Sequence, residues 1–382
     1  MLKNSNTQAH TPYYIYDTEL FTRTIKAALA EAACLPMAQI HFAIKSNSNP
    51  HLVSIAAREG LGADCVSGAE IERSIACGVA AERIVFAGVG KTDAEINYAL
   101  DMGIGCFNVE SVPELDVIND LAARKGRVAP VAFRINPNVD AHTHANITTG
   151  LEENKFGIAM TDMVTVINHA KQLDNVRYLG LHFHIGSQVL DMTCFRLLSQ
   201  RINELQDQLE AAGITNTASI NVGGGLGIDY EKPEQNPIPN FHDYFRAFAD
   251  NLRLRSGQSL HFELGRALSA QCGSLITQCL YVKTTASKQF VIVDAGMSDL
   301  LRPALYDAHH KIVNLTGQAE QRPLRTYDVV GPICESSDVF DKDIVLHEVR
   351  RGDRLAILSA GAYGFVMASQ YNLRTLPQEV VE

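Results

Sequence analysis

The alternation of short apolar runs with amphipathic segments is the feature that most restricts how this chain can fold. Each run is rich in β-branched and other apolar residues, and each segment between runs repeats its apolar residues with a helical period. Eight strands alternating with helices over about 250 residues predict a (β/α)8 barrel rather than an open doubly wound sheet. The predicted strands lie near residues 40–44, 61–66, 83–87, 104–108, 129–135, 178–184, 217–222 and 260–264. The predicted helices lie near residues 50–59, 68–77, 93–102, 111–125, 161–173, 193–212 and 240–255, after an earlier helix that Asp17 caps and that runs to about Cys34.

The pattern changes after residue 264, where strand-like runs follow one another with few helical periods between them. We expect an all-β second domain, either a β-sandwich or a β-barrel. The segment PYYIY at 12–16 also resembles a strand, and we expect it to pair with this domain. The prediction is a barrel over residues 17–263 and a discontinuous β-domain over 1–16 and 264–382. The later strand-like runs lie at 273–285, 289–294, 325–330, 344–349 and 354–359.

The overall charge and the absence of long apolar runs limit the partners that this chain is expected to have. The 382 residues carry a formal charge of −10, which argues against nucleic acid and anionic membrane surfaces as partners. The N-terminal residues are polar, and no run of about 18 apolar residues occurs, so we expect a cytoplasmic protein. The eight cysteines form no C-x-x-C pair, and we expect most of them to be buried small hydrophobic residues.

Polar residues stand at the carboxyl ends of six predicted barrel strands. In a (β/α)8 barrel these ends surround the mouth where catalysis takes place. A single lysine at such a position is usually an ordinary solvated cation, but six polar residues at six strand ends are hard to explain as surface charge. The six residues are Lys45, Asp64, Asn108, Arg134, His184 and Glu263.

Two glycine-containing loops follow the seventh and eighth predicted strands, where such barrels commonly bind phosphate. The first is NVGGGLGI from Asn221, and the second contains Gly265 and Arg266. The first loop departs from the G-x-G-x-x-G dinucleotide fingerprint, and a purely structural turn is the alternative reading. A phosphate site with a lysine and an acidic residue suggests pyridoxal 5′-phosphate (PLP). Lys45 would form the imine, Glu263 would hold the ring nitrogen protonated, and His184 would stack on the ring.

Motifs along nearly the whole chain resemble a known family. AIKSN, NVESVPEL, FRINPNVDAHTH, TGLEENKFGI, HFHIGSQ, NVGGGLGI, ELGR, RPALY, GPICESSD and SAGAYG occur in this order. The set resembles the PLP-dependent decarboxylases of the alanine racemase-like fold (fold type III), and among them the diaminopimelate decarboxylases. This resemblance implies a homodimer with shared active sites that converts meso-2,6-diaminopimelate to L-lysine and CO2, the last step of lysine biosynthesis.

The resemblance also implies a role for each matching residue. Lys45 resembles the Schiff-base lysine that leads to a quinonoid carbanion, Glu263 the partner of the ring nitrogen, and His184 the stacking histidine. Cys334 resembles a proton donor and Glu335 a contact for the far amino group of the substrate, both supplied by the partner subunit. The implied phosphate contacts are Ser187, Gly224, Gly225, Gly265 and Arg266, and Tyr363 lies near the cofactor. The implied substrate contacts are Arg266, Arg302, Tyr306, Glu335 and Tyr363.

Several alternatives remain open from the residues alone. The enzyme could act on ornithine, arginine or carboxynorspermidine, although Arg302 with Glu335 favours a substrate with a distal amino-acid head. A racemase is disfavoured because the acidic Glu263 stabilises a fully delocalised carbanion. A catalytically silent PLP-binding homologue is the alternative from a different class.

The remaining histidines have simpler explanations than catalysis or metal binding. No carboxylate or cysteine set at ligand spacing accompanies His142 and His144, or the His309-His310 pair, and no metal is expected. His41, His182 and His261 are expected to fill the barrel interior or to form hydrogen bonds there.

Overall fold

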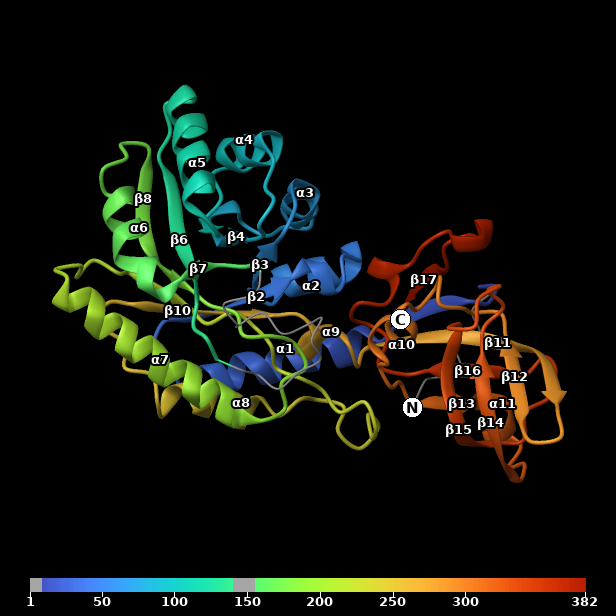
Figure 1. Cartoon of the computed structure of the whole chain (residues 1–382). Coiled ribbons are helices and arrows are strands. Elements are labelled where there is room, and N and C mark those ends of the chain that lie inside the picture. The colour runs from blue at the N-terminus through green and yellow to red at the C-terminus, as the bar shows by residue number, and fades with distance from the viewer. Residues whose placement is uncertain (1–8, 140–154) are drawn as a thin grey trace. The chain divides into compact units, whose positions relative to one another are not determined.

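The computed structural model describes residues 9–139 and 155–382. The chain divides into two compact units (Figure 1). The barrel unit comprises Thr24–Gly227 and Asn240–Gly265. The sheet unit comprises Met1–Arg23, Ile228–Pro239 and Arg266–Glu382.

Eight parallel strands form the closed barrel of the first unit. The pairing runs from β2 through β3, β4, β5, β6, β8 and β9 to β10, and the parallel pairing of β10 with β2 closes the ring. A short ninth strand, β7 (Ile158–Ala159), pairs with β6 outside the ring. The barrel strands are β2 (Ala38–Ala43), β3 (Gly62–Cys65), β4 (Ile84–Phe86), β5 (Cys106–Val109), β6 (Ala129–Asn136), β8 (Val176–His182), β9 (Ser219–Asn221) and β10 (Ser259–Leu264).

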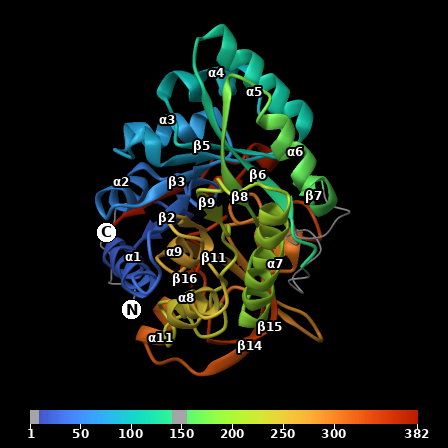
Figure 2. The ribbon, with the colours of Figure 1, turned by 90° about the vertical axis from the view of Figure 1, so that its left-hand side faces the viewer.

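Helices connect the barrel strands and lie around the outside of the sheet (Figure 2). Local signals define their first turns. The Asp17 carboxylate accepts a hydrogen bond from the Leu20 amide at 2.8 Å, and Thr92 and Glu95 form a capping box. The helices are α1 (Thr18–Ala32), α2 (Pro50–Arg58), α3 (Gly68–Ala76), α4 (Asp93–Met102), α5 (Val112–Arg124), α6 (Met163–Ala170), α7 (Met192–Ala211) and α8 (Phe241–Ala249).

A mixed eight-stranded sheet forms the second unit. Its main path runs β13, β16, β11, β12, β14, β15, and β1 pairs with both β11 and β17. Most neighbours are antiparallel, whereas β12–β14 and β1–β17 are parallel. The strands are β1 (Tyr13–Tyr16), β11 (Gly273–Thr284), β12 (Gln289–Val293), β13 (Ile312–Asn314), β14 (Leu324–Val330), β15 (Val339–His347), β16 (Arg354–Ile357) and β17 (Gln378–Val381).

The predicted fold class is confirmed, with differences in detail. Each of the eight predicted barrel strands overlaps an observed one, and the PYYIY strand pairs with the later sheet as expected. The second unit is not purely β, because α9 (Arg266–Ser269), α10 (Arg302–Tyr306) and α11 (Leu315–Ala319) interrupt it. The predicted domain bounds stay a prediction. The compact units differ from them by placing residues 17–23 and 228–239 with the sheet unit and residues 264 and 265 with the barrel unit.

Within the two described ranges, no helix combines the length and the apolar character needed to cross a membrane.

Candidate active site

Lys45 lies just beyond β2, in the 3-10 turn Ile44–Ser46, rather than within the strand. Its Nζ is 2.6 Å from Oδ2 of Asp64 on the neighbouring strand β3. The lysine side chain is 34% exposed, whereas that of Asp64 is fully buried. Burial raises the pKa of Asp64, the Glu263 charge raises it further, and the Lys45 charge acts in the opposite direction. The barrel mouth therefore holds an accessible amine beside a buried carboxyl group.

Glu263, near the end of β10, is buried and receives three hydrogen bonds inside the barrel. Asn108 and Asn221 donate to its Oε1 at 3.1 and 2.7 Å, and His182 Nε2 donates to its Oε2 at 3.1 Å. Burial by itself raises the pKa of Glu263, but the His182 and Lys45 charges and the His182 hydrogen bond together hold it below its usual range. A carboxylate accepts about four hydrogen bonds, so Oε2 of Glu263 can still accept one more hydrogen bond.

His184 follows β8 and is partly exposed at the barrel mouth. Burial, followed by the charges of Arg134 and Lys45, lowers the pKa of His184 well below its ordinary value. Its Nδ1 accepts a hydrogen bond from the Gly224 amide at 3.3 Å. His184 is therefore a neutral imidazole, which suits a flat stacking surface.

The predicted phosphate contacts of the barrel unit follow three neighbouring strands. The Val189 amide donates to the Gly225 carbonyl at 2.9 Å, which places the loop containing Ser187 beside the glycine loop. A Cβ at Gly224 would collide with the Glu263 carbonyl oxygen, so close packing alone explains that glycine. Gly265 follows β10, and a Cβ there would meet the Ser46 Cβ at 3.0 Å. The loops after β8, β9 and β10 thus lie together at one end of the barrel.

A buried charge network supports this end of the barrel. Lys91, whose side chain is 1% exposed, donates to the Asn108 carbonyl at 2.9 Å and to Glu114 at 2.6 Å. Arg134 donates to Glu110 at 2.9 Å, and the Glu110 amide donates to Glu114 at 2.8 Å. These contacts fix the carboxyl ends of β5 and β6, which carry Asn108 and Arg134.

Sequence reasoning missed several of these supporting residues. It assigned His182 to the barrel interior without linking it to Glu263, and it gave no role to Asn221, Lys91, Glu110 or Glu114. Asn221 had a usable signal, because it lies at a predicted strand end two positions before the first glycine, Gly223. The Lys91 network had none, because its charges lie in loops and helices whose contacts depend on the tertiary fold.

The sheet unit gathers a second group of predicted residues around Tyr230. The Arg266 guanidinium donates to the Tyr230 hydroxyl at 2.7 Å and lies 4.9 Å from the Tyr363 ring centroid. Arg302 lies 4.8 Å from the Tyr230 ring centroid. Tyr306 is the last residue of the short helix α10, which Arg302 begins. Arg266 and Arg302 are buried and suit anions.

Cys334 and Glu335 lie on the exposed surface of the sheet unit. The Asn372 side chain accepts a hydrogen bond from the Cys334 amide at 3.1 Å, and the Ser337 hydroxyl donates to Glu335 at 2.8 Å. Hydrogen bonds from Ser337 and Tyr371 lower the pKa of Glu335. Five of the other seven cysteines are buried, as predicted, whereas Cys334 and Cys34 are exposed.

The histidines inside the barrel form a neutral hydrogen-bonded pair, as the sequence suggested. His41 Nε2 is 2.9 Å from His261 Nδ1, and His261 Nε2 is 2.8 Å from the Ser259 hydroxyl. Burial lowers the pKa of His41 to about 4 and that of His261 to about 3. The pair borders a cavity of about 200 Å³ that Asn108 and Asn221 also line.

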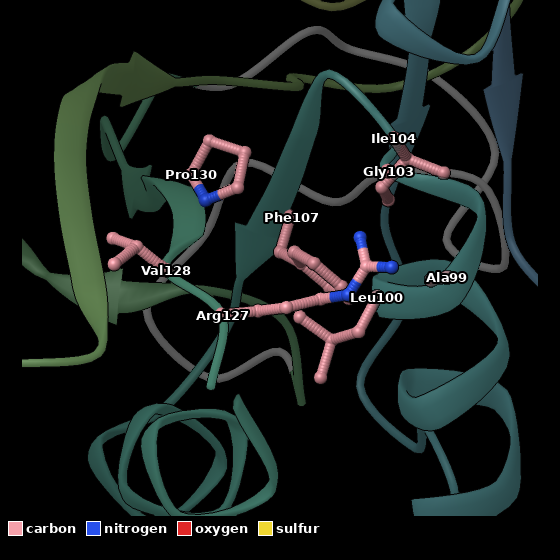
Figure 3. A pocket seen from close by; sticks show the side chains of 8 residues that line it. All are labelled: Ala99, Leu100, Gly103, Ile104, Phe107, Arg127, Val128 and Pro130. Carbon is pink, nitrogen blue, oxygen red and sulfur yellow. The ribbon is translucent and has the colours of Figure 1, made fainter. Parts of the chain in front are cut away.

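A separate pocket of about 190 Å³ lies near the amino-terminal ends of β5 and β6, away from the strand ends that carry Lys45 and Glu263. Figure 3 shows the Arg127 side chain beside Leu100 and Phe107 in this pocket. Its lining is mainly apolar and lacks the predicted site residues, so it is not the candidate active site. The lining residues are Ala99, Leu100, Gly103, Ile104, Phe107, Arg127, Val128 and Pro130.

Four histidines could suggest a metal site from the sequence: His142, His144, His309 and His310. His142 and His144 lie outside the described residues. His309 is 3.0 Å from Asp341 and 3.6 Å from Glu231, and His310 contacts Arg302 instead. Among residues 9–139 and 155–382, no group of three or more His, Cys, Asp or Glu side chains could hold a metal ion.

The barrel residues fit PLP, the cofactor suggested by the sequence. Lys45 offers an accessible amine, and Glu263 offers an ionised carboxylate that can accept one more hydrogen bond from a ring N–H. Oδ1 of Asp64 is buried and has no hydrogen-bond partner among the described residues, so this oxygen can also accept a hydrogen bond from a bound group.

Comparisons with known proteins agree with this geometry. The family described as "Pyridoxal-dependent decarboxylase, pyridoxal binding domain" matches residues 22–270. The diaminopimelate decarboxylase of Bacteroides thetaiotaomicron is 58% identical over 368 residues, covering 96% of this chain and 94% of that protein. That of Aquifex aeolicus is 40% identical, covering 97% of this chain and 86% of its own length.

Solved structures extend the similarity to the fold. The diaminopimelate decarboxylase of Helicobacter pylori in complex with L-lysine has a TM-score of 0.90 and 42% identity, covering 98% of this chain and 92% of that chain. The lysine/ornithine decarboxylase of Vibrio vulnificus in complex with putrescine shares the fold alone, with a TM-score of 0.84, 22% identity, and coverage of 98% and 95%. The chain therefore belongs to the pyridoxal-dependent decarboxylases, and within them to the diaminopimelate decarboxylase family, whose cofactor is pyridoxal 5′-phosphate.

Proposed function

We propose that this chain decarboxylates meso-2,6-diaminopimelate to L-lysine and CO2. The observation that carries the proposal is that an accessible Lys45 amine and a buried, ionised Glu263 both stand at the carboxyl ends of strands of the same barrel. The 58% identity to a diaminopimelate decarboxylase supports the choice of substrate. The reaction releases one carboxylate as CO2 and places one proton on the carbon that carried it.

The barrel residues are proposed to hold the cofactor and set its charge. Lys45 would hold the cofactor covalently through its amine, and Glu263 would keep a proton on the ring nitrogen. Asn108, Asn221 and His182 keep Glu263 oriented, because each donates a hydrogen bond to its carboxylate. When bound, the cofactor supplies an electron sink for the electron pair left by the departing CO2.

The loops at the same end are proposed to bind the phosphate group. The family resemblance implies phosphate contacts from the Ser187 hydroxyl group and from the backbone of Gly225 and Gly265, since glycines let an anion approach the backbone closely. The Gly224 amide already donates to His184, so Gly224 contributes mainly by permitting close packing. Neutral His184 can pack on a flat ring without adding a positive charge.

Residues of the sheet unit are proposed, from the family resemblance and their chemistry, to recognise the substrate. Arg302 suits the distal carboxylate of a diamino diacid, and Glu335 suits its ammonium group. Arg266 suits an anionic group, and Tyr306 and Tyr363 can supply hydroxyl groups. Cys334 carries an exposed thiol that can donate the proton to carbon.

Substrate choice is the direct test of this function. The purified holoenzyme should release CO2 from meso-diaminopimelate with a kcat/KM at least about 30-fold above that for ornithine, arginine or carboxynorspermidine. The reason is that unpaired charged contacts cost about 2–5 kcal/mol. CO2 release should be measured with all four substrates side by side, and HPLC should identify L-lysine as the product.

The same assay separates the alternatives. Preferred turnover of another diamino acid would replace the proposed substrate. Interconversion of stereoisomers without CO2 release would indicate a racemase. PLP binding without turnover of any of the four would indicate a silent homologue.

We further propose that the enzyme is a homodimer in which Cys334 and Glu335 serve the partner's active site. Their exposure supports this, because neither side chain is buried within its own chain. A heterodimer of a Lys45→Ala subunit and a Cys334→Ala subunit should then regain part of the activity, up to about one half of that of the wild-type dimer, since one of its two sites is intact. CO2 release from purified, differentially tagged heterodimers would measure it.

The control is each mutant as a homodimer, which should remain nearly inactive. Verified heterodimers with no more activity than these homodimers would contradict shared sites.

A further inference from the structure

His310 makes an unusual contact with Arg302 within the sheet unit. The histidine is buried, at 1% exposure, and its Nε2 lies 2.6 Å from the Arg302 guanidinium. Its Nδ1 lies 2.9 Å from the Leu358 carbonyl. Because a carbonyl only accepts hydrogen bonds, Nδ1 carries the proton and Nε2 presents a lone pair. The guanidinium, which only donates, therefore donates to a neutral imidazole.

A neutral partner is unexpected for a buried arginine, because buried charges are normally paired with opposite charges. Arg302 is 5% exposed, and no carboxylate in the described part of the chain forms an ion pair with it. Its guanidinium also lies over the face of Tyr230, and its Nε has no hydrogen-bond partner among the described residues. The hydrogen bond to His310 thus orients the Arg302 guanidinium without neutralising its positive charge.

The electrostatic setting keeps His310 neutral. Burial, with a further contribution from the Arg302 charge, lowers the pKa of His310 to about 3. His310 therefore stays unprotonated at neutral pH. A carboxylate at the same place would also orient Arg302, but it would cancel the charge that an incoming anion needs.

We propose that His310 is a positioning residue that orients Arg302 while preserving its full charge for the distal carboxylate of the substrate. The inference rests on the proposed function, because that substrate supplies the carboxylate. It assigns His310 to substrate selection, acting through Arg302, rather than to metal binding or to catalysis.

Three substitutions separate orientation from charge. His310→Gln can place a neutral acceptor near the position of Nε2. His310→Asn can still donate to Leu358 but is too short to reach Arg302. His310→Glu reaches Arg302 but brings a negative charge. If His310 only filled space, Gln and Glu, which differ little in volume, would behave alike.

The holoenzymes should be compared by kinetics and by calorimetric binding. The Asn and Glu variants should raise KM for meso-diaminopimelate on the order of 10-fold. The Asn variant loses the hydrogen bond that orients Arg302, and the Glu variant offsets the positive charge of Arg302. Their kcat should change less, and the Gln variant should stay within about 3-fold of wild type on both values. Binding of L-lysine, which keeps the distal carboxylate, should weaken on the order of 10-fold, whereas binding of cadaverine, which lacks it, should not.

Two outcomes would overturn the role of His310 alone. In the first, the wild type is active but the His310→Glu variant binds L-lysine as tightly as the wild type does. In the second, the variants bind L-lysine and cadaverine more weakly by the same factor. If the Asn variant fails to fold, the L-lysine affinities of the Gln and Glu variants are enough to test the role of His310. A wild-type holoenzyme that neither decarboxylates meso-diaminopimelate nor binds L-lysine would refute the proposed function itself, and with it the role of His310.

Discussion

Replacing Lys45 with alanine is expected to lower CO2 release on the order of 10³-fold or more, because the reaction would lose both its covalent attachment point and an amine at the reacting centre. The variant should also lose the long-wavelength absorbance that PLP shows when attached to a lysine. Lys45 stands at the carboxyl end of β2 with its side chain 34% exposed, so little packing is lost with it. Steady-state CO2 release and an absorbance spectrum of the purified protein measure the two effects.

A matched control distinguishes this role from a general effect of removing a lysine. Lys26 is 64% exposed and its nearest ion-pair contact, with Glu59, is 3.8 Å long. Lys26→Ala should leave both activity and absorbance unchanged, because exposed pairs contribute about 0–1 kcal/mol. A Lys45→Ala protein that keeps the lysine-bound absorbance would show that another lysine holds the cofactor.

The barrel could be predicted because its signals are local. Each apolar run from 40–44 to 260–264 marks a strand, and the connecting helices repeat their apolar residues in sequence. The short strands β13 and β17 were not predicted, because no regular alternation of strands and helices surrounds them, as it surrounds the equally short β4 and β9. RPALY was not recognised as helix α10, because a helix of five residues has no complete amphipathic repeat.

The candidate site was predictable where it depends on strand ends. Lys45, Asp64 and Glu263 follow from the rule that parallel strands in a barrel place their carboxyl ends together. The contacts of Asn221 and His182 with Glu263 join residues distant in sequence, and side-chain direction decides them. The pairing of His310 with Arg302 also depends on packing, because eight positions separate them and the turn between them is irregular.

Replacing Glu263 with glutamine is expected to lower kcat by about 10²–10³-fold, the usual cost of removing one preorganised electrostatic partner. Glutamine keeps the size but removes the charge, and its NH2 group would face donors from Asn108, Asn221 or His182. An unsatisfied buried donor costs about 1–3 kcal/mol, so the free energy of unfolding should be measured with the kinetics. Asn221→Ala is the matched control: it removes one donor at 2.7 Å but keeps the carboxylate, and we expect a loss of about 10-fold.

The pH dependence of kcat tests the same residue independently. The pKa of Glu263 is held below its usual range, so the carboxylate is already ionised above its unfolded pKa of about 4.3. Its contribution to stability is therefore present above that pH and is lost as the pH falls through the folded-state pKa. Wild-type kcat should show no acidic limb from Glu263 between pH 5 and 9. Asn221→Ala should raise the Glu263 pKa and move any acidic limb upward, because a hydrogen bond to the charged form is lost. A Glu263→Gln enzyme within 10-fold of wild type would mean that the ring nitrogen does not depend on this charge.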